Sequence, residues 1–159
     1  MHALDVLKYG HLTVLHTVRD LPDDDWLTPN VCGVWSVREI IAHLASFEYA
    51  LVEALSVARG GPVGPHLGDL LRDGQAYNDV QVAARTGLSA AETLAEYESV
   101  QAQTMELTAA LPSSLFFNTG FLPAYGMEYD LEDYIAYSFY GHKREHSAQI
   151  GVFRDAIGR

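Results

Sequence analysis

The sequence of 159 residues is poor in cysteine and in basic side chains. A single cysteine, Cys32, excludes an intrachain disulfide and is typical of a reducing compartment. Ten Lys and Arg residues against 21 Asp and Glu residues give a formal net charge of -11. We therefore expect no nucleic acid among its partners, because a nucleic-acid binder needs a basic surface, and no docking on anionic lipid.

Long uncharged apolar runs are also missing. The best candidate is interrupted by Glu39, Glu48 and Glu53, so we predict no segment that spans a membrane. Residues 1–5 do not show the basic segment and long apolar run of a signal peptide. These observations predict a cytoplasmic protein.

Several catalytic motifs are absent as well. The sequence has no G-x-S-x-G, no P-loop and no G-x-G-x-x-G. The H-E-x-x-H helix of metalloproteases requires Glu after its first histidine, but Lys143 follows His142. Paired Glu-x-x-His motifs of di-iron bundles do not occur. Cys32 lacks a context that would clearly lower its pKa, so we interpret it as structural.

Length and patterning predict an all-α protein with a single domain, residues 1–159. A hydrophobic fraction of 48% and a charged fraction of 19% are typical of a globular chain. Apolar residues at helical spacing predict four helices, at about 3–20, 36–58, 89–111 and 130–157. These helices favour a four-helix bundle, with long connections between the second and third helices and between the third and fourth.

Helix starts are marked by caps. Ser36 with Glu39, and Ser89 with Glu92, each match the S-x-x-E capping box, and Asp130 or a near neighbour is expected to cap the last helix. The third helix has inward positions that are more polar than those of the other helices, and they either line a cavity or indicate a half-exposed helix. These positions are Leu94, Tyr97, Gln101, Thr104 and Thr108. The aromatic loop that follows, 112–128, is expected to form a lid or a partner-facing surface, compatible with a homodimer.

The last predicted helix carries the most informative pattern. Projected at 3.6 residues per turn, His142 and His146 lie one turn apart in the middle of an apolar stripe. The stripe consists of Ile135, Phe139, Ile150, Phe153 and Ile157. Burying two imidazoles without partners is costly, so the pair needs partners. A third histidine, His43, lies on the flank of the second helix's apolar stripe. His11 also lies on an apolar stripe, and we interpret it as a core or groove histidine, whereas His66 is expected to be exposed.

Three histidines on core-facing helices predict a divalent metal site. Imidazole is a common ligand, and an i,i+4 pair can bind one ion at about 2.0–2.1 Å per bond. Three protein ligands leave one or more positions open for water or substrate, as in catalytic sites. The alternative is that the histidines are hydrogen-bonded core residues.

Two segments together resemble the DinB-like family of metalloenzymes. They are Trp35-Ser-Val-Arg-Glu-Ile-Ile-Ala-His43-Leu and His142-x3-His146-x2-Gln149-Ile150, and Tyr77-Asn78-Asp79 is a looser match. The resemblance spans nearly the whole chain. It implies a four-helix bundle in up-down-down-up order, often dimeric, with His43, His142 and His146 as ligands of zinc or nickel. It also implies similarity to mycothiol-dependent maleylpyruvate isomerase and thiol S-transferases.

Two further residues are candidates for supporting roles. Gln149 either orients a ligand or a bound water, or makes a polar contact between helices. Glu39 can fix the tautomer of His43 by accepting its other N–H, but the capping box competes for the same carboxylate and is favoured. Gly141 lowers helix propensity, which predicts close approach of a neighbouring helix there. No residue clearly qualifies as a general base, so the catalytic residues stay unassigned.

The resulting hypothesis is Lewis-acid activation of water or a low-molecular-weight thiol for attack on a small electrophile. Resemblance favours a thiol-dependent transferase or isomerase. A metal-dependent hydrolase is the second candidate. A non-enzymatic metal- or small-molecule-binding stress protein is the third.

Overall fold

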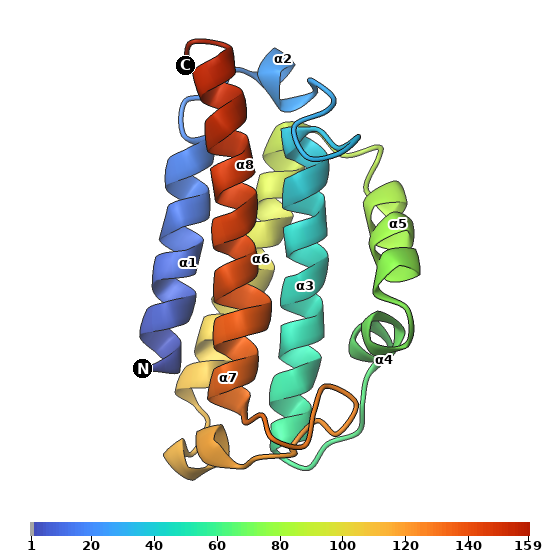
Figure 1. Cartoon of the computed structure of the whole chain (residues 1–159), viewed down its shortest axis with the longest axis vertical. Coiled ribbons are helices and arrows are strands. Elements are labelled where there is room, and N and C mark those ends of the chain that lie inside the picture. Colours follow the sequence, from blue (N-terminus) through green and yellow to red (C-terminus); the bar gives the residue numbers. More distant parts are fainter. Residues whose placement is uncertain (1) are drawn as a thin grey trace.

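Four long helices build the molecule, and the computed structural model describes residues 2–159 with no β-strand among them. The bundle helices are α1 (Ala3–Val18), α3 (Val37–Ala58), α6 (Ala90–Ala109) and a final helix made of α7 (Leu131–Ile135), η2 (Ala136–Gly141) and α8 (His142–Ala156). In Figure 1, α1 and α8 run upward while α3 and α6 run downward. The predicted four-helix bundle and its up-down-down-up order are confirmed.

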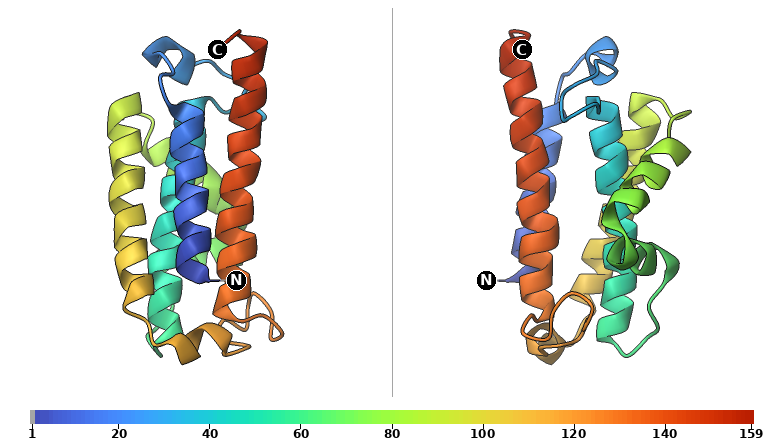
Figure 2. Two further views of the ribbon diagram at one scale, coloured as in Figure 1. Left: turned by 90° about the vertical axis from the view of Figure 1, so that its left-hand side faces the viewer. Right: turned by 45° about the vertical axis from the view of Figure 1, so that its right-hand side comes forward.

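Short elements fill the connections. The short helix α2 (Asp23–Trp26) lies between α1 and α3, and η1 (Ser113–Phe117) follows α6. Two more helices, α4 (Pro65–Arg72) and α5 (Gly74–Ala84), return the chain from the end of α3 to the start of α6. They pack on the outer side of α3, away from the other bundle helices (Figure 2).

The extra cover from α4 and α5 buries α3 on nearly all sides. Besides its apolar positions, His43, Ser46 and Glu48 are all buried. In the described part of the chain, α3 is the one helix long and apolar enough to cross a membrane. However, 67% of the relevant window is buried inside the bundle, which is what a core helix shows.

The predicted caps are present. The backbone N–H of Ser36 donates to Glu39 Oε2 at 2.8 Å, and Ser89 donates to Glu92 in the same way. Both serine hydroxyls accept the N3 backbone N–H in return. Asp130 accepts the backbone N–H of Asp133 at 2.9 Å and starts α7. Caps of this kind stabilise a helix by about 1 kcal/mol each.

The polar inward positions of α6 are buried, while much of the rest of the helix is exposed. Tyr97, Gln101, Thr104 and Thr108 are at most 5% exposed. Each threonine hydroxyl donates to the carbonyl one turn earlier in its own helix, at 3.1 Å for Thr104 and 2.7 Å for Thr108. The hydroxyls are therefore satisfied locally.

The aromatic loop 112–128 closes the end of the bundle where α6 finishes and α7 begins (Figure 1). Phe116, Phe121 and Tyr125 pack against the apolar core at this end of the bundle, which includes Leu131 and Tyr134. The Tyr125 and Tyr134 ring centroids are 4.6 Å apart. His43 lies in the second turn of α3, toward the other end. The loop is therefore not a lid over the histidines.

A π-helical turn, η2, interrupts the final helix just before His142. A π turn contains one more residue than an α turn, so the residues beyond it are rotated by about 100° relative to a uniform helix. The face of α8 that points into the bundle consequently carries Lys143, Ser147 and Ile150. His142 and His146 move from the middle of the apolar face toward its flank, beside α3.

The apolar stripe expected from a uniform helix is correct only in part. Ile135, Phe139 and Ile150 are buried, whereas Ile157 is 40% exposed. The close helix approach expected at Gly141 is wrong, because a Cβ there would meet only Ala136 O of its own helix, at 3.5 Å.

Close approach occurs instead at Gly10 of α1. A Cβ at Gly10 would lie 3.2 Å from Tyr140 Cδ2 and 3.3 Å from Lys143 Cδ. Glycine therefore lets α1 pack tightly against the final helix at the turn that carries the histidine pair.

Candidate metal centre

Three imidazoles from α3 and α8 converge at one point. His142 Nε2 lies 2.9 Å from His43 Nε2 and 2.9 Å from His146 Nε2. One nitrogen from each ring lies within 4.8 Å of the other two, so the cluster could hold a metal ion. His43 and His146 are buried, whereas His142 is half-buried and reaches the surface.

The cluster forms where α3 and α8 are bridged by side chains. The backbones of these two helices approach each other much less closely than those of α3 and α6. His43 comes from the second turn of α3, whose start is set by the Ser36 cap. His142 and His146 follow directly after the π turn, one α-helical turn apart.

Aromatic rings surround the buried side of the cluster. Trp35 and Phe47 lie 4.9 and 4.7 Å from the His43 ring, and Phe47 is 4.4 Å from the His142 ring, measured between centroids. Trp35 is placed by a tight turn, in which Gly33 has φ +58° and the Trp35 N–H donates to Cys32 O at 2.9 Å. These rings exclude water from His43.

Burial keeps the imidazoles neutral near pH 7. Desolvation, followed by the proximity of the other two rings, lowers the pKa of His43 to about 2. Desolvation and then His146 lower the pKa of His142 to about 3. Desolvation also lowers the pKa of His146, although Gln149 and Glu145 act in the opposite direction. Neutral imidazoles are the form that binds metals.

Hydrogen bonding shows that the donor set fits a cation. Gln149 Oε1, which can only accept, lies 2.8 Å from His146 Nδ1. In the tautomer with its proton on Nδ1, His146 donates to Gln149 and presents the Nε2 lone pair to the cluster. A single proton on His142 Nε2 cannot make good hydrogen bonds to both neighbouring nitrogens at 2.9 Å. A metal ion would satisfy all three lone pairs together.

The sequence matches one known family. The sequence profile of the DinB superfamily matches residues 11–150. The chain belongs to the DinB superfamily. All three histidines lie within the matched range. Searches of curated proteins and of solved structures gave no match.

The two supporting residues expected around the histidines behave differently. Gln149 hydrogen-bonds His146, which is the ligand-orienting alternative. Glu39 instead accepts from both the N–H and the hydroxyl of Ser36, at 2.8 and 2.9 Å. His43 Nδ1 has no hydrogen-bond partner among the described residues. The tautomer role considered for Glu39 is therefore wrong, and capping accounts for its carboxylate.

Cys32 lies close to the histidine cluster, which the sequence did not indicate. Its thiol lies near the Gln149 side chain. Desolvation and then the Glu145 carboxylate raise the pKa of the Cys32 thiol, while the Gln149 contact lowers it. The net shift is upward, so the thiol is a poor nucleophile, as predicted.

A second polar cluster occupies the bundle centre. Lys143 Nζ is 2.5 Å from Glu48 Oε1, and both side chains are at most 2% exposed. Lys143 Nζ also lies 5.7 Å from the Tyr97 ring centre, and His11 Nδ1 is 3.3 Å from Tyr97 Oη. His11 is half-buried, in keeping with the predicted core or groove role. A uniform helical projection leaves Lys143 off the centre of the stripe, which is why its burial was not predicted.

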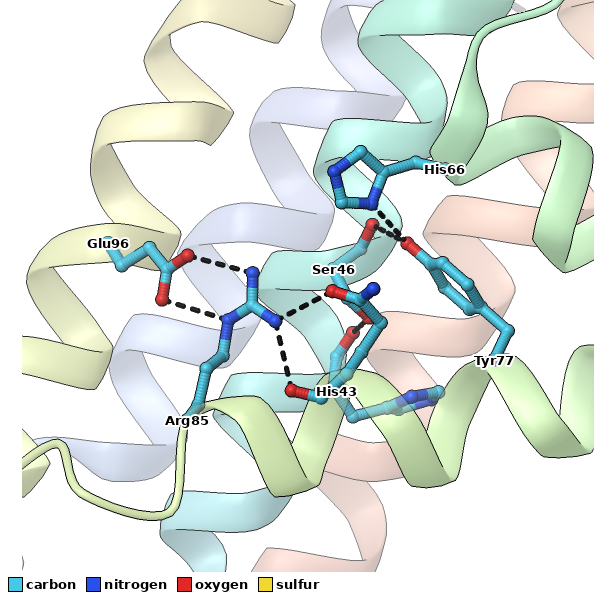
Figure 3. Close-up of polar contacts among 7 residues, drawn as sticks. His43, Ser46, His66, Tyr77, Arg85 and Glu96 are labelled. Atoms are coloured by element: carbon cyan, nitrogen blue, oxygen red, sulfur yellow. Dashed lines mark hydrogen bonds and ion pairs between the residues drawn. The ribbon is translucent and has the colours of Figure 1, made fainter.

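The covering helices are joined to α3 through Tyr77, in the segment of looser DinB resemblance. Figure 3 shows the Tyr77 hydroxyl between His66 and Ser46. The hydroxyl donates to Ser46 O at 2.7 Å and accepts from His66 Nδ1 at 3.1 Å. Ser46 in turn donates to the His43 carbonyl at 2.7 Å. These contacts support the turn of α3 that carries His43.

His66 and Arg85 complete this outer layer. The expectation that His66 is exposed is wrong, because it is half-buried and stacks on Tyr49 with ring centroids 5.0 Å apart. Arg85 binds Glu96 through two nitrogens, at 2.9 and 2.8 Å, and joins the end of α5 to α6 (Figure 3).

Proposed function

We propose that this DinB-superfamily protein is a divalent-metal-dependent enzyme that acts on a small electrophile with a low-molecular-weight thiol, as a transferase or isomerase. The convergence of three imidazole Nε2 atoms carries the proposal. Zinc or nickel is the expected ion, and it would supply Lewis acidity that lowers the pKa of a nucleophile beside it.

The chain's own residues would provide orientation and access. Gln149 holds His146 in the tautomer that presents Nε2. Trp35 and Phe47 keep water away from His43. His142 is the least buried of the three histidines, so a substrate would approach the ion from its side.

A thiol is favoured over water as the nucleophile. No carboxylate in the described range makes a hydrogen bond to the three histidines, so no general base is in place. A free thiol has a pKa of about 8.5, far below the value of about 15.7 for water, and therefore needs less help to lose its proton.

Metal content decides the first half of the proposal. We expect stoichiometric zinc or nickel in protein purified without a nickel column, measured by plasma mass spectrometry. His43→Ala and His146→Ala should lose the ion, and His16→Ala, at an exposed position of α1, is the matched control. No stoichiometric ion, with metal binding unchanged in both cluster variants, would contradict the metal site.

Turnover decides the second half. Metal-loaded protein is assayed with several thiols against a chromogenic aryl halide and other small electrophiles, and separately with a nitrophenyl ester and no thiol. Thiol-dependent product that disappears in His146→Ala supports the proposal. Turnover of the ester alone would identify a hydrolase instead. Bound metal without turnover in either assay would indicate a metal-binding protein that is not an enzyme.

A further inference from the structure

The buried ion pair Glu48–Lys143 lies immediately beside the histidine cluster. Lys143 follows His142 in sequence, and Glu48 lies on α3, the helix that carries His43. Their charged atoms are 2.5 Å apart, with side-chain exposures of 0% and 2%. Beyond this contact, the three charged atoms of the pair have no hydrogen-bond partner among the described residues. Each charge therefore depends on the other.

This mutual dependence constrains the rotation of α8. Lys143 reaches Glu48 only because the π turn rotates α8 by about 100° relative to a uniform helix. The same rotation places His142 and His146 beside His43. In a uniform helix, Lys143 would leave the bundle centre, and the two histidines would face away from their present partner.

We propose that the Glu48–Lys143 ion pair is a positioning device for the metal centre, which fixes the rotation of α8 so that three histidines meet. Neither residue contacts the point where the Nε2 atoms converge. Buried ion pairs often add little net stability, and fixing one arrangement among several is their best-supported use. This proposal rests on the proposed metal site, but the rotation can be measured without metal.

Removing one charge should turn the helix. In Glu48→Gln, the Lys143 ammonium stays buried without a counter-charge, and straightening the π turn lets it move toward solvent. The ring pair His43–His142, now with centroids 4.8 Å apart, would separate. We expect cobalt affinity to fall about 10- to 100-fold, the usual effect of losing support around a ligand.

Two further variants separate positioning from packing. In the double variant Glu48→Leu/Lys143→Met, both charges are gone and the apolar side chains fill similar volumes, so α8 should keep its rotation and cobalt affinity should return to near the wild-type value. Glu96→Gln breaks the ion pair with Arg85, which does not involve α8, and should leave cobalt affinity unchanged.

The experiment has two measurements. Cobalt affinity is measured by titration, with the d–d absorption of bound cobalt as the signal. The distances between rings are monitored in metal-free protein through nuclear Overhauser effects between ring protons. Measurements in sucrose keep weakened variants folded. The proposal is supported if Glu48→Gln loses the nuclear Overhauser effect between the His43 and His142 rings but retains the one between the Tyr49 and His66 rings. Retention of the His43–His142 effect in Glu48→Gln, or its loss in the double variant as well, would overturn it.

If wild-type protein bound no cobalt, the metal site would be refuted. The ring-proton effects would still decide whether the ion pair sets the rotation of α8.

Discussion

At Gln149, one hydrogen bond determines which nitrogen of His146 faces the cluster. In Gln149→Ala, the imidazole can rotate and change tautomer, so we expect zinc affinity to fall about 10- to 100-fold. Gln149→Glu keeps an acceptor for Nδ1–H and should retain most of the affinity. Competition with a chromophoric chelator measures both values.

The matched control for Gln149 is Gln75→Ala, an exposed glutamine that hydrogen-bonds Asp79 on α5. Its zinc affinity should equal that of the wild type. Equal affinity in Gln149→Ala as well would show that the Gln149 contact does not orient His146.

The lowered histidine pKa values predict a dependence of metal-free stability on pH. The pKa of His43 is about 2 when folded and near 6.5 when unfolded, so below pH 6.5 the unfolded chain binds more protons. The free energy of unfolding should therefore fall as the pH is lowered from 6.5, by up to about 1.4 kcal/mol per pH unit for His43 alone. His142 acts in the same direction.

Urea denaturation of metal-free protein between pH 7.5 and 5 measures this slope. His43→Phe removes one titrating group and should give a shallower decrease, which separates its contribution from those of other groups. Identical slopes in the two proteins would contradict the lowered pKa of His43.

Single residues were predictable from sequence where local rules apply. The i,i+4 spacing of His142 and His146, with His43 on another core-facing helix, indicated the cluster that the structure brings together. The proximity of Cys32 to Gln149 was not predictable, because the turn before α3 brings them together across distant parts of the chain. The burial of Lys143 was missed for a different reason, which concerns the helix as a whole.

At the scale of elements, caps and apolar spacing predicted the bundle helices well. Ser36 and Ser89 mark starts that the structure shows within a residue. The π turn has no such signature, because its cost is offset by contacts elsewhere in the bundle, including Lys143 with Glu48. A projection at 3.6 residues per turn therefore placed His142 rather than Lys143 at the centre of the buried face, although Ile150 is buried as expected.

Deleting one residue within η2 tests this account. Removing Tyr137, which is 62% exposed, should convert the π turn to an α turn while the helix on either side keeps its position. Zinc affinity should stay close to that of the wild type. The control is deletion of the exposed Arg144, which rotates His146 by about 100° relative to His142 and should abolish binding.

Zinc titration and circular dichroism of the two deletion variants provide the measurement. A loss of zinc binding on removal of Tyr137, in protein that keeps its helical content, would show that the π turn does more than set the rotation of α8.

At the scale of the whole molecule, the metal centre would join two helices that otherwise touch little. Contacts between α3 and α6, and between α1 and α8, run along the bundle, whereas α3 and α8 meet through a few side chains: His43 and Phe47 with His142, and Glu48 with Lys143. An ion held by both helices would therefore oppose their separation. Unfolding should become harder when the metal is bound.

The expected size of that stabilisation follows from linkage. With free zinc at 100 times its dissociation constant, the free energy of unfolding rises by about 2.7 kcal/mol. For a chain of this length, this corresponds to a rise of about 5–10 °C in Tm, measured by calorimetry on metal-free protein with and without zinc. His16→Ala should show the same rise, and His146→Ala should show almost none. An equal rise in His146→Ala would place the stabilising ion outside the three-histidine cluster.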